Sequence, residues 1–533
     1  MWRAIARKEL LNHLASFRFW AGALLAILLA ASSTGVAARD FNLRRTAFLD
    51  RTASEEAKLR AVSVYSYLQP LAIRPPEPLS VLDQGFDSRL GTGVAIQLFA
   101  IPVEASGGQR GNELLASVPA VDLTTVVSVV LGLLALLLTC DSLVGEREEG
   151  LLRAVFAQGA SRRSVLAGKL AGSLVTMCLP LAAALLAALA VFRLVVKMPL
   201  TADQWLRTAG LAASYLVYLS LMLLLGLLIS VHVRSSGAAL SLSVALWFVL
   251  TIAVPAVAWA AAGDLLPTEG VKRSVERDVA KLTADYDRRL VAELRRVPLR
   301  TTASGHTALS FASGENRAVR YRHGSAAYYN ALRGYYQFEA RAGVRQASEV
   351  FAVRQRYEAR LRAGERLGTG LAALSPAFLL DRLSESFAGT SLAEHDRFLA
   401  SCRRYRLEML AYMESQGAWR SWRWFTDDPP GGLRPWPRYL GLLPEEVGPG
   451  EVSRLFSRLS EPGVEASVRR DRERIQRDAS RLLSRAGMPV FSYRGASLGS
   501  ALRGQAPAGA ALLLLNGLVA LFVAVGFRRC EAG

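Results

Sequence analysis

Patterns for several kinds of catalysis are missing from the 533 residues. With only four cysteines and five histidines, the chain offers no disulfide framework and no paired zinc-ligand spacing. The metalloprotease pattern H-E-x-x-H does not occur. Asp122 and Asp141 fall at opposite ends of one apolar run, too far apart for an aspartyl protease pair. We therefore expect no catalytic residue and no metal site.

A phosphate-binding loop is also missing. The pair Gly168–Lys169 could end such a loop, but the motif requires glycine at position 163 and serine or threonine at position 170. The chain has Arg163 and Leu170 there. We therefore expect no nucleotide site of this type, no ATPase activity of the chain's own, and no cofactor.

Acidic residues are in the minority, with 45 Asp and Glu against 64 Lys and Arg and a net charge of +19. Such a charge can indicate nucleic-acid binding. Here the arginines are spread through helical segments without interleaved aromatic residues, so we expect no nucleic-acid partner. Anionic lipid headgroups or a partner subunit would balance the charge instead.

Long apolar runs dominate what is present. Hydrophobic residues make up 51% of the chain and gather in blocks of about 20, the length that crosses a bilayer as a helix. The blocks predict an all-α polytopic membrane protein with six transmembrane helices and a mostly helical extracytoplasmic domain. Pro180 predicts a kink in the third span and Pro255 an interruption in the fifth. Gly168 and Gly172 form a GxxxG pattern, which favours close helix packing.

The predicted organisation divides the chain into six parts. They are an amphipathic interfacial helix at 1–16, the first transmembrane helix at 17–38, a first extracytoplasmic loop at 39–120, transmembrane helices two to five at 121–262 with a cytoplasmic loop at 141–165, a large extracytoplasmic domain at 263–507, and the sixth helix with a cytoplasmic tail at 508–533. An alternative for the N-terminus is a signal peptide cleaved after residues 36–38.

The distribution of lysine and arginine sets the expected orientation. Basic residues in the first 16 residues, the 141–165 loop, the turn at Arg234 and the tail at 528–529 place both termini inside. The connector at 193–207 is an exception, because it carries three basic residues on the opposite side.

Local patterns predict elements in the two polar blocks. Residues 73–80 resemble polyproline, and 94–98 are a strand candidate. Apolar stripes predict helices at 271–294, 326–361 and 379–387, and a last helix through residues 468, 475 and 482. Ser375–Pro376 is a helix start, and Ser391 with Glu394 predicts a capping box. Four tryptophans favour a local core or a membrane-interface belt over a ligand site: Trp419, Trp422, Trp424 and Trp436.

The charged stretch Asp141–Lys169 separates two apolar runs and must therefore lie in water. After Glu149–Gly150, apolar residues at 151, 152, 155 and 156 predict a short amphipathic helix. The residues alone leave open an ordinary basic cytoplasmic loop.

The order of Asp141, Glu146, Glu149–Gly150, a short helix, Ser161–Arg162 and Gly168–Lys169 resembles the export-type permeases of ABC transporters. The stretches PLSVLDQG and SPAFLLDRLSESFAG are similar to members of that family with large external loops.

The resemblance implies that this connector faces a separate ATP-binding cassette ATPase subunit. The residues expected to couple to it are Glu146, Arg147, Glu149 and Gly150. It also implies a bacterial cytoplasmic (inner) membrane location, contact with the lipid bilayer, a second permease copy or paralogous permease, and a periplasmic partner protein. The alternative function is a membrane-anchored receptor or assembly scaffold without transport. Neither the substrate nor the direction of transport follows from the sequence.

Overall fold

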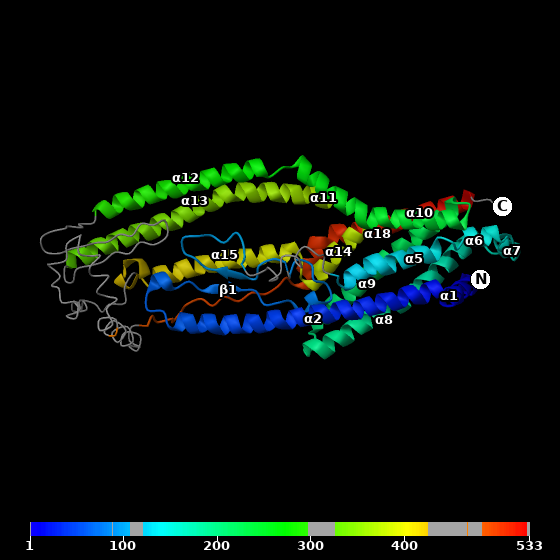
Figure 1. The fold of residues 1–533 in the computed structure, drawn as a ribbon, viewed down its shortest axis with the longest axis horizontal. Helices are drawn as coiled ribbons and strands as arrows, with labels where there is room; N and C mark the ends of the chain where they lie inside the picture. The colour runs from blue at the N-terminus through cyan, green and yellow to red at the C-terminus, as the bar shows by residue number, and fades with distance from the viewer. Residues whose placement is uncertain are drawn as a thin grey trace.

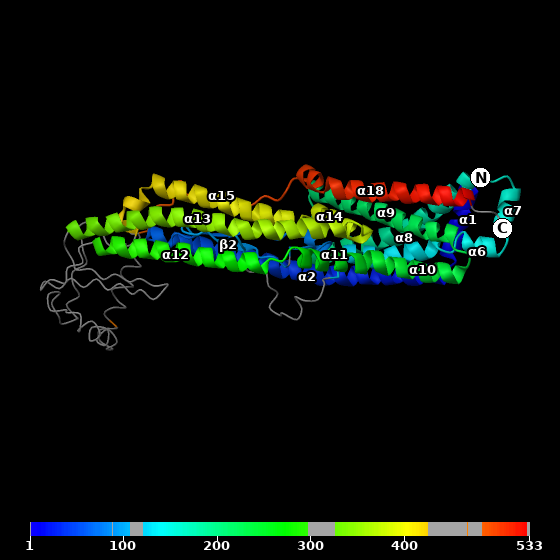
Figure 2. The same ribbon diagram turned by 90° about the horizontal axis from the view of Figure 1, so that it is seen from above.

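The computed structural model describes residues 2–87, 89–106, 121–296, 326–424, 466 and 482–529, and the structural statements below concern these residues. They form an elongated molecule of helices that run mostly along one axis (Figure 1; Figure 2). Both termini lie at one end, which we call the terminal end. The opposite end is called the distal end, and the half of the molecule next to it is called the distal half.

Six helical segments are long and apolar enough to cross a membrane, which confirms the predicted fold class of an all-α polytopic membrane protein. Four of them are single helices, and each of the other two contains a π-helical segment. The segments are α2 (Phe17–Arg60); α4 (Leu123–Thr125), η3 (Val126–Leu131), α5 (Gly132–Thr139) and α6 (Val144–Glu148); α8 (Arg162–Val196); α9 (Ala202–His232); α10 (Ser236–Phe248), η4 (Val249–Ala253) and α11 (Val254–Leu265); and α18 (Leu498–Arg529).

The interruption predicted at Pro255 is present as η4, which ends two residues before the proline. Proline lacks the amide hydrogen that continues α-helical bonding, so the turn before it readily adopts a wider hydrogen-bond pattern. The helix α8 continues through Pro180 to Val196.

We predicted that the first transmembrane segment ends near residue 38. The helix that contains this segment does not end there and runs on to Arg60. Neither glycine nor proline occurs between Val36 and Arg60 to stop it. Pairs of opposite charge four residues apart, including Asp40 with Arg44, support the polar half. At about 1.5 Å per residue, the 44-residue helix is long enough to cross a membrane and continue well beyond it.

Two long helices, α12 (Glu269–Arg296) and α13 (Ala326–Ala372), lie side by side in the distal half (Figure 1; Figure 2). The predicted stripe on α12 is present, with Val275 and Leu290 buried. The helix α13 extends past the predicted end at residue 361 and packs on α11, where a Cβ atom on Gly368 would lie 2.7 Å from the Trp259 ring.

The helices α14 (Pro376–Ala388) and α15 (Leu392–Ser415) follow. Ser375 caps α14 by accepting a hydrogen bond from the Phe378 amide, as predicted. Gly389 ends α14 in the left-handed conformation with φ of 73°. The capping box predicted for α15 is wrong: Ser391 makes no side-chain cap bond, and the Glu394 carboxylate accepts from Tyr493 and Ala496 rather than from the Ser391 amide.

A second core lies in the distal half, against α15. The strands β1 (Leu71–Ile73) and β2 (Gly93–Ala95) pair antiparallel, with Leu71 opposite Ala95 and Ile73 opposite Gly93. Four short 3-10 turns flank this core within the described ranges: η1 (Tyr65–Tyr67), η2 (Pro78–Val81), η5 (Ala418–Arg420) and η6 (Trp422–Trp424). Of the stretch 73–80 predicted to resemble polyproline, Ile73 belongs to β1, 78–80 belong to η2, and 74–77 form neither helix nor strand; the predicted strand overlaps β2.

Trp424 is buried in this second core, 4.7 Å from the Trp419 ring and 6.1 Å from the Phe99 ring between centroids. The local-core interpretation of these tryptophans is thus confirmed for Trp419 and Trp424. Trp436 and the predicted helix positions 468 and 475 lie outside the described residues.

The described part of the block 263–507 shares its core with other parts of the chain, whereas its stripes led us to expect a core made within the block. Leu379, Leu380 and Leu383 of α14 join the core of the spans, where α14 packs on α9 and α18. The second core combines residues of the first polar block, such as Ile96, with Phe398 of α15. An apolar stripe identifies a buried face but carries no information about which element covers it.

Candidate functional site

The charged stretch between the second and third spans folds as two short helices, α6 and α7 (Leu151–Ala157), at the terminal end (Figure 1). Gly150 joins them with φ of 72°, a conformation that residues with a Cβ atom rarely adopt. Glu149 and Gly150 are exposed, whereas Leu152 is buried. The short helix predicted after Gly150 is confirmed.

Glu146 faces the protein rather than open solvent. Its side chain is 14% exposed and accepts hydrogen bonds from two ammonium groups, Lys8 Nζ at 2.8 Å and Lys169 Nζ at 3.0 Å. The Lys8 pKa is raised, chiefly by its hydrogen bond to this carboxylate. Glu146 therefore holds the N-terminal helix against the connector.

Lys169 is the centre of this arrangement. Only 1% of its side chain is exposed, and its Nζ lies 2.5 Å from Glu9 Oε1 and 2.7 Å from the Ser142 carbonyl oxygen. A buried ammonium without partners would be expensive, so these acceptors make its position tenable. The three charged side chains Glu9, Glu146 and Lys169, together with Lys8, are called the buried ion cluster below.

The helix α1 (Trp2–Leu14) docks on α8 at its two glycines. A Cβ atom on Gly168 would lie 2.8 Å from the Trp2 carbonyl oxygen, and one on Gly172 would lie 2.6 Å from that of Ala6. The GxxxG pattern thus marks close packing, and its partner is α1. The other side of α1 leaves Trp2 and Leu11 exposed, 47% and 56% respectively.

Three further contacts tie this end of the molecule together. The Arg147 guanidinium donates to the Val231 and Val233 carbonyls, each at 3.4 Å. The Glu148 carboxylate accepts from the Ser236 hydroxyl at 2.6 Å at the start of α10. Arg162 donates to the Phe527 carbonyl of α18 at 3.0 Å. We call α1, α6, α7 and the first turns of α8 the platform.

The four residues predicted for ATPase coupling therefore divide into two pairs. Glu146 and Arg147 bind groups of this chain, whereas Glu149 and Gly150 form the exposed tip of the platform. Sequence reasoning missed Glu9 and placed Lys169 at the end of the charged connector, without predicting that its ammonium is buried in an ion cluster. Lys169 lies at the start of an apolar run, and an ionisable residue in such a run signals a buried partner.

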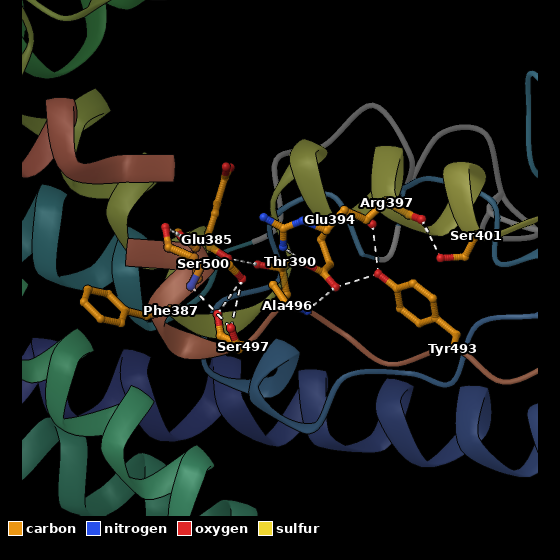
Figure 3. A network of polar contacts seen from close by, with 12 residues as sticks. Glu385, Phe387, Thr390, Glu394, Arg397, Ser401, Tyr493, Ala496, Ser497 and Ser500 are labelled. Atoms are coloured by element: carbon orange, nitrogen blue, oxygen red, sulfur yellow. Dashed lines mark hydrogen bonds and ion pairs between the residues drawn. The ribbon is translucent and has the colours of Figure 1, made fainter. Parts of the chain in front are cut away.

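A second polar network lies where the distal half meets the spans (Figure 3). Glu394 Oε1 accepts from the Tyr493 hydroxyl at 2.6 Å and from the Ala496 amide at 3.0 Å. The Ala496 carbonyl accepts from Arg207 of α9, whose guanidinium also reaches the Phe387 carbonyl at 3.4 Å. We call this network the joint. It clamps the segment that leads into α18 between a distal helix and a span.

The joint also accounts for Arg207, one of the three basic residues that broke the predicted charge rule. Arg207 is 7% exposed and pairs with Asp203 at 2.6 Å. It serves as an internal tether and is unavailable as a loop charge, so counting it in the orientation rule overstated the exception.

Buried carboxyl groups surround the joint. Asp122 caps α4 through the Thr125 amide at 2.8 Å and also accepts from the Gln84 amide at 3.1 Å. Asp83 accepts from the Thr124 hydroxyl at 2.9 Å. Burial is the main cause that raises the pKa of Asp83 and of Asp122. No group of acidic, cysteine or histidine residues in the described ranges has the arrangement of a metal site.

Comparison with known families now identifies the class. Residues 3–283, more than half of the chain, match the ABC-2 family transporter protein model, and residues 325–427 match a domain of unknown function, DUF3526. A search of curated proteins gives no match.

The chain therefore belongs to the ABC-2 transporter family. It is a multi-pass membrane protein and the permease subunit of an ABC transporter, and its family implies partnership with an ATP-binding cassette subunit.

Proposed function

We propose that this permease couples ATP hydrolysis by a separate ATP-binding subunit to export, or to conformational work on the outer side of a bacterial cytoplasmic membrane. The platform carries the proposal. It presents the exposed Glu149–Gly150 tip on a base held by the buried ion cluster. A rigid base with a charged tip can transmit a push from a soluble subunit to α8, and charges at an interface rim orient a partner.

The bias of basic residues toward the terminal end supports an inward-facing platform and an outward-facing distal half. A second permease, identical or paralogous, would complete the pathway. The distal half would then recognise a periplasmic partner or a large substrate, since ordering it costs about 1–2 kcal/mol per residue in backbone entropy.

The alternative is a receptor or scaffold that transports nothing. A scaffold needs one or two spans for anchoring, whereas this chain has six candidate spans in its described part. A scaffold also does not need an exposed tip that is connected to the sixth span through the contact of Arg162 with Phe527. Both observations favour the coupled permease.

The test uses the tip without disturbing its base. The double variant Glu149→Lys/Leu151→Asp changes two exposed side chains at the junction of α6 and α7. We expect normal thermal unfolding but at least a tenfold loss of ATPase-subunit binding and of permease-stimulated ATP hydrolysis in nanodiscs. A matched control, Asp50→Lys, changes an exposed charge on the distal part of α2 and should leave both unchanged. Full coupling in the double variant would show that the tip is not the docking site.

A further inference from the structure

A groove runs along the distal part of α2, outside both the platform and the joint. One wall is α2, with Phe48, Thr52 and Leu59, and the other is the segment 485–491. Leu71 and Ile73 of β1 lie between these walls, and the groove encloses about 550 Å³. This size falls within the about 300–1,000 Å³ typical of ligand sites.

Within the described ranges, the pairing of β1 leaves one of its edges without a strand. On the inner edge, the Arg74 amide donates to the Thr92 carbonyl at 2.7 Å, and the Pro70 carbonyl accepts from the Ile96 amide at 2.9 Å. Antiparallel pairing alternates, so the amide and carbonyl groups of Leu71 and Ile73 point to the other edge. No hydrogen bond to these groups occurs among the described residues.

The opposite wall begins with a turn at 486–487 and continues at 488–491 without helix or strand. Val490 is 87% exposed, while Tyr405 donates to the Pro489 carbonyl at 3.1 Å and holds the segment in place. Met488 and Phe491 pack against the second core, which fixes the wall on its inner side. An open strand edge and an anchored wall thus flank one apolar channel.

The groove continues toward the spans into a smaller basic pocket. Phe48 and Ile73 line both parts. Among the described residues, the inner pocket contains Arg44, Arg51 and Arg74 but a single acid, Asp87, which pairs with Arg44 and Arg74. The outer part is lined by Glu55, Glu56 and Arg485. The two outer carboxylates already pair with Lys58 and Arg60 of α2, so the excess charge lies at the inner end, which is positive.

We propose that this groove binds an extended segment of another polypeptide, which adds to β1 as a third strand. The outward-facing amide and carbonyl groups of Leu71 and Ile73 bind the peptide backbone, and the apolar walls accept alternate side chains. Charge complementarity at the inner pocket sets the direction, with acidic or C-terminal groups of the peptide placed there. An acyl chain would leave the edge amides unpaired, at a free-energy cost.

This inference rests on the proposed recognition role of the distal half and names its ligand class. It does not depend on ATPase coupling, because peptide binding can be measured on the permease alone. A failure of peptide binding and a failure of ATPase coupling can therefore be distinguished.

The geometry offers a selective variant. Ile73→Pro removes an amide hydrogen that faces the groove and leaves the bonds between β1 and β2 in place, since proline is tolerated at an open edge. Ile73→Val keeps the amide and is the matched control. Thr52→Trp fills the groove, and Thr46→Trp puts the same side chain on an exposed position of α2 outside it.

The probe is a random library of about eight-residue peptides, the length of a typical longer strand, displayed against the full chain in nanodiscs. We expect enriched peptides with alternating apolar residues and an acidic group toward one end. Their affinity should fall at least tenfold on Ile73→Pro and Thr52→Trp, and should be unchanged on Ile73→Val and Thr46→Trp. N-methylation of the peptide at alternate amides should cause a similar loss.

Four outcomes would overturn the inference. They are a selection that enriches nothing, selected peptides that bind Ile73→Pro as well as wild type, a lipid that copurifies with wild type but not with Thr52→Trp, and a homodimer that Thr52→Trp dissociates. The last two would assign the groove to lipid or to a second copy. Thermal unfolding of each variant separates loss of binding from loss of folding.

Discussion

Removing the ammonium of Lys169 should undock α1 from the platform. In Lys169→Ala, the carboxylates of Glu9 and Glu146 would lose a shared partner that now lies 2.5 Å and 3.0 Å from them. Glu9 is only 5% exposed, so water cannot easily replace the lost charge. Breaking a buried ion pair on one side costs about 3–5 kcal/mol. This is enough to shift the docking of α1 by a factor of about a hundred to several thousand.

Lys8 supplies the comparison, because it pairs with the same Glu146 but is 46% exposed. Exposed pairs contribute about 0.2–1 kcal/mol, so Lys8→Ala should have a small effect. Native-state hydrogen exchange of the α1 amides in nanodiscs measures the opening free energy directly. The charge-balanced variant Glu9→Gln/Lys169→Met should recover most of the loss, because Lys8 and Glu146 then remain as a pair.

Equal effects of Lys169→Ala and Lys8→Ala would refute the reasoning, since burial would then not govern the energy of the cluster. Failure of the charge-balanced variant to recover stability would also contradict it. In that case, the shape of the lysine side chain between α1 and α8 would matter more than its charge.

Two further predictions concern the pH dependence of stability and the orientation in the membrane. Burial raises the pKa of Glu77 from 4.5 to about 7, so the folded state binds its proton more tightly than the unfolded state does, and stability should fall as pH rises between these values. Glu77→Gln should remove up to about 3 kcal/mol of this pH dependence in thermal unfolding, and an unchanged profile would contradict the assignment. Single cysteines placed at Ser54 and Ser161, both exposed, test orientation: an impermeant maleimide should label position 54 but not position 161 in intact cells, and the reverse pattern would invert the topology.

The sequence predicted the six spans and the interruption at Pro255 well, because these depend on local physical requirements. A run of apolar residues must be helical in a membrane, and Pro255 must disturb a helix wherever that helix lies. Likewise, the exposed turn at Gly150 and the cap at Ser375 depend on the backbone of a few neighbouring residues. These features needed no knowledge of tertiary contacts.

The sequence failed where an assignment depended on a distant partner. Glu394 has the spacing of a capping box, but Tyr493 and Ala496, about a hundred positions away, claim its carboxylate. Glu9 and Lys169 are separated by 160 positions and are joined only because α1 folds back onto α8. The stripe on α14 was correct as a buried face, yet its partners are spans and not distal helices.

The helix α18 connects the platform to the joint, and this bears on how a signal could cross the molecule. At the terminal end, the Phe527 carbonyl is bound by Arg162, which belongs to the platform. At the other end, Ala496, two residues before α18 begins, is held by Glu394 of α15 and by Arg207 of α9. A helix clamped near both ends transmits axial displacement better than bending, since its backbone hydrogen bonds run along its axis. Movement of the platform relative to α9 would therefore displace the contacts of the joint. Of the two residues that bind Ala496 there, Glu394 belongs to the distal half and Arg207 belongs to a span. Through this contact, we expect a displacement of the tip to move α15. The second core, which contains β1 and borders the peptide groove, packs on α15 and would move with it.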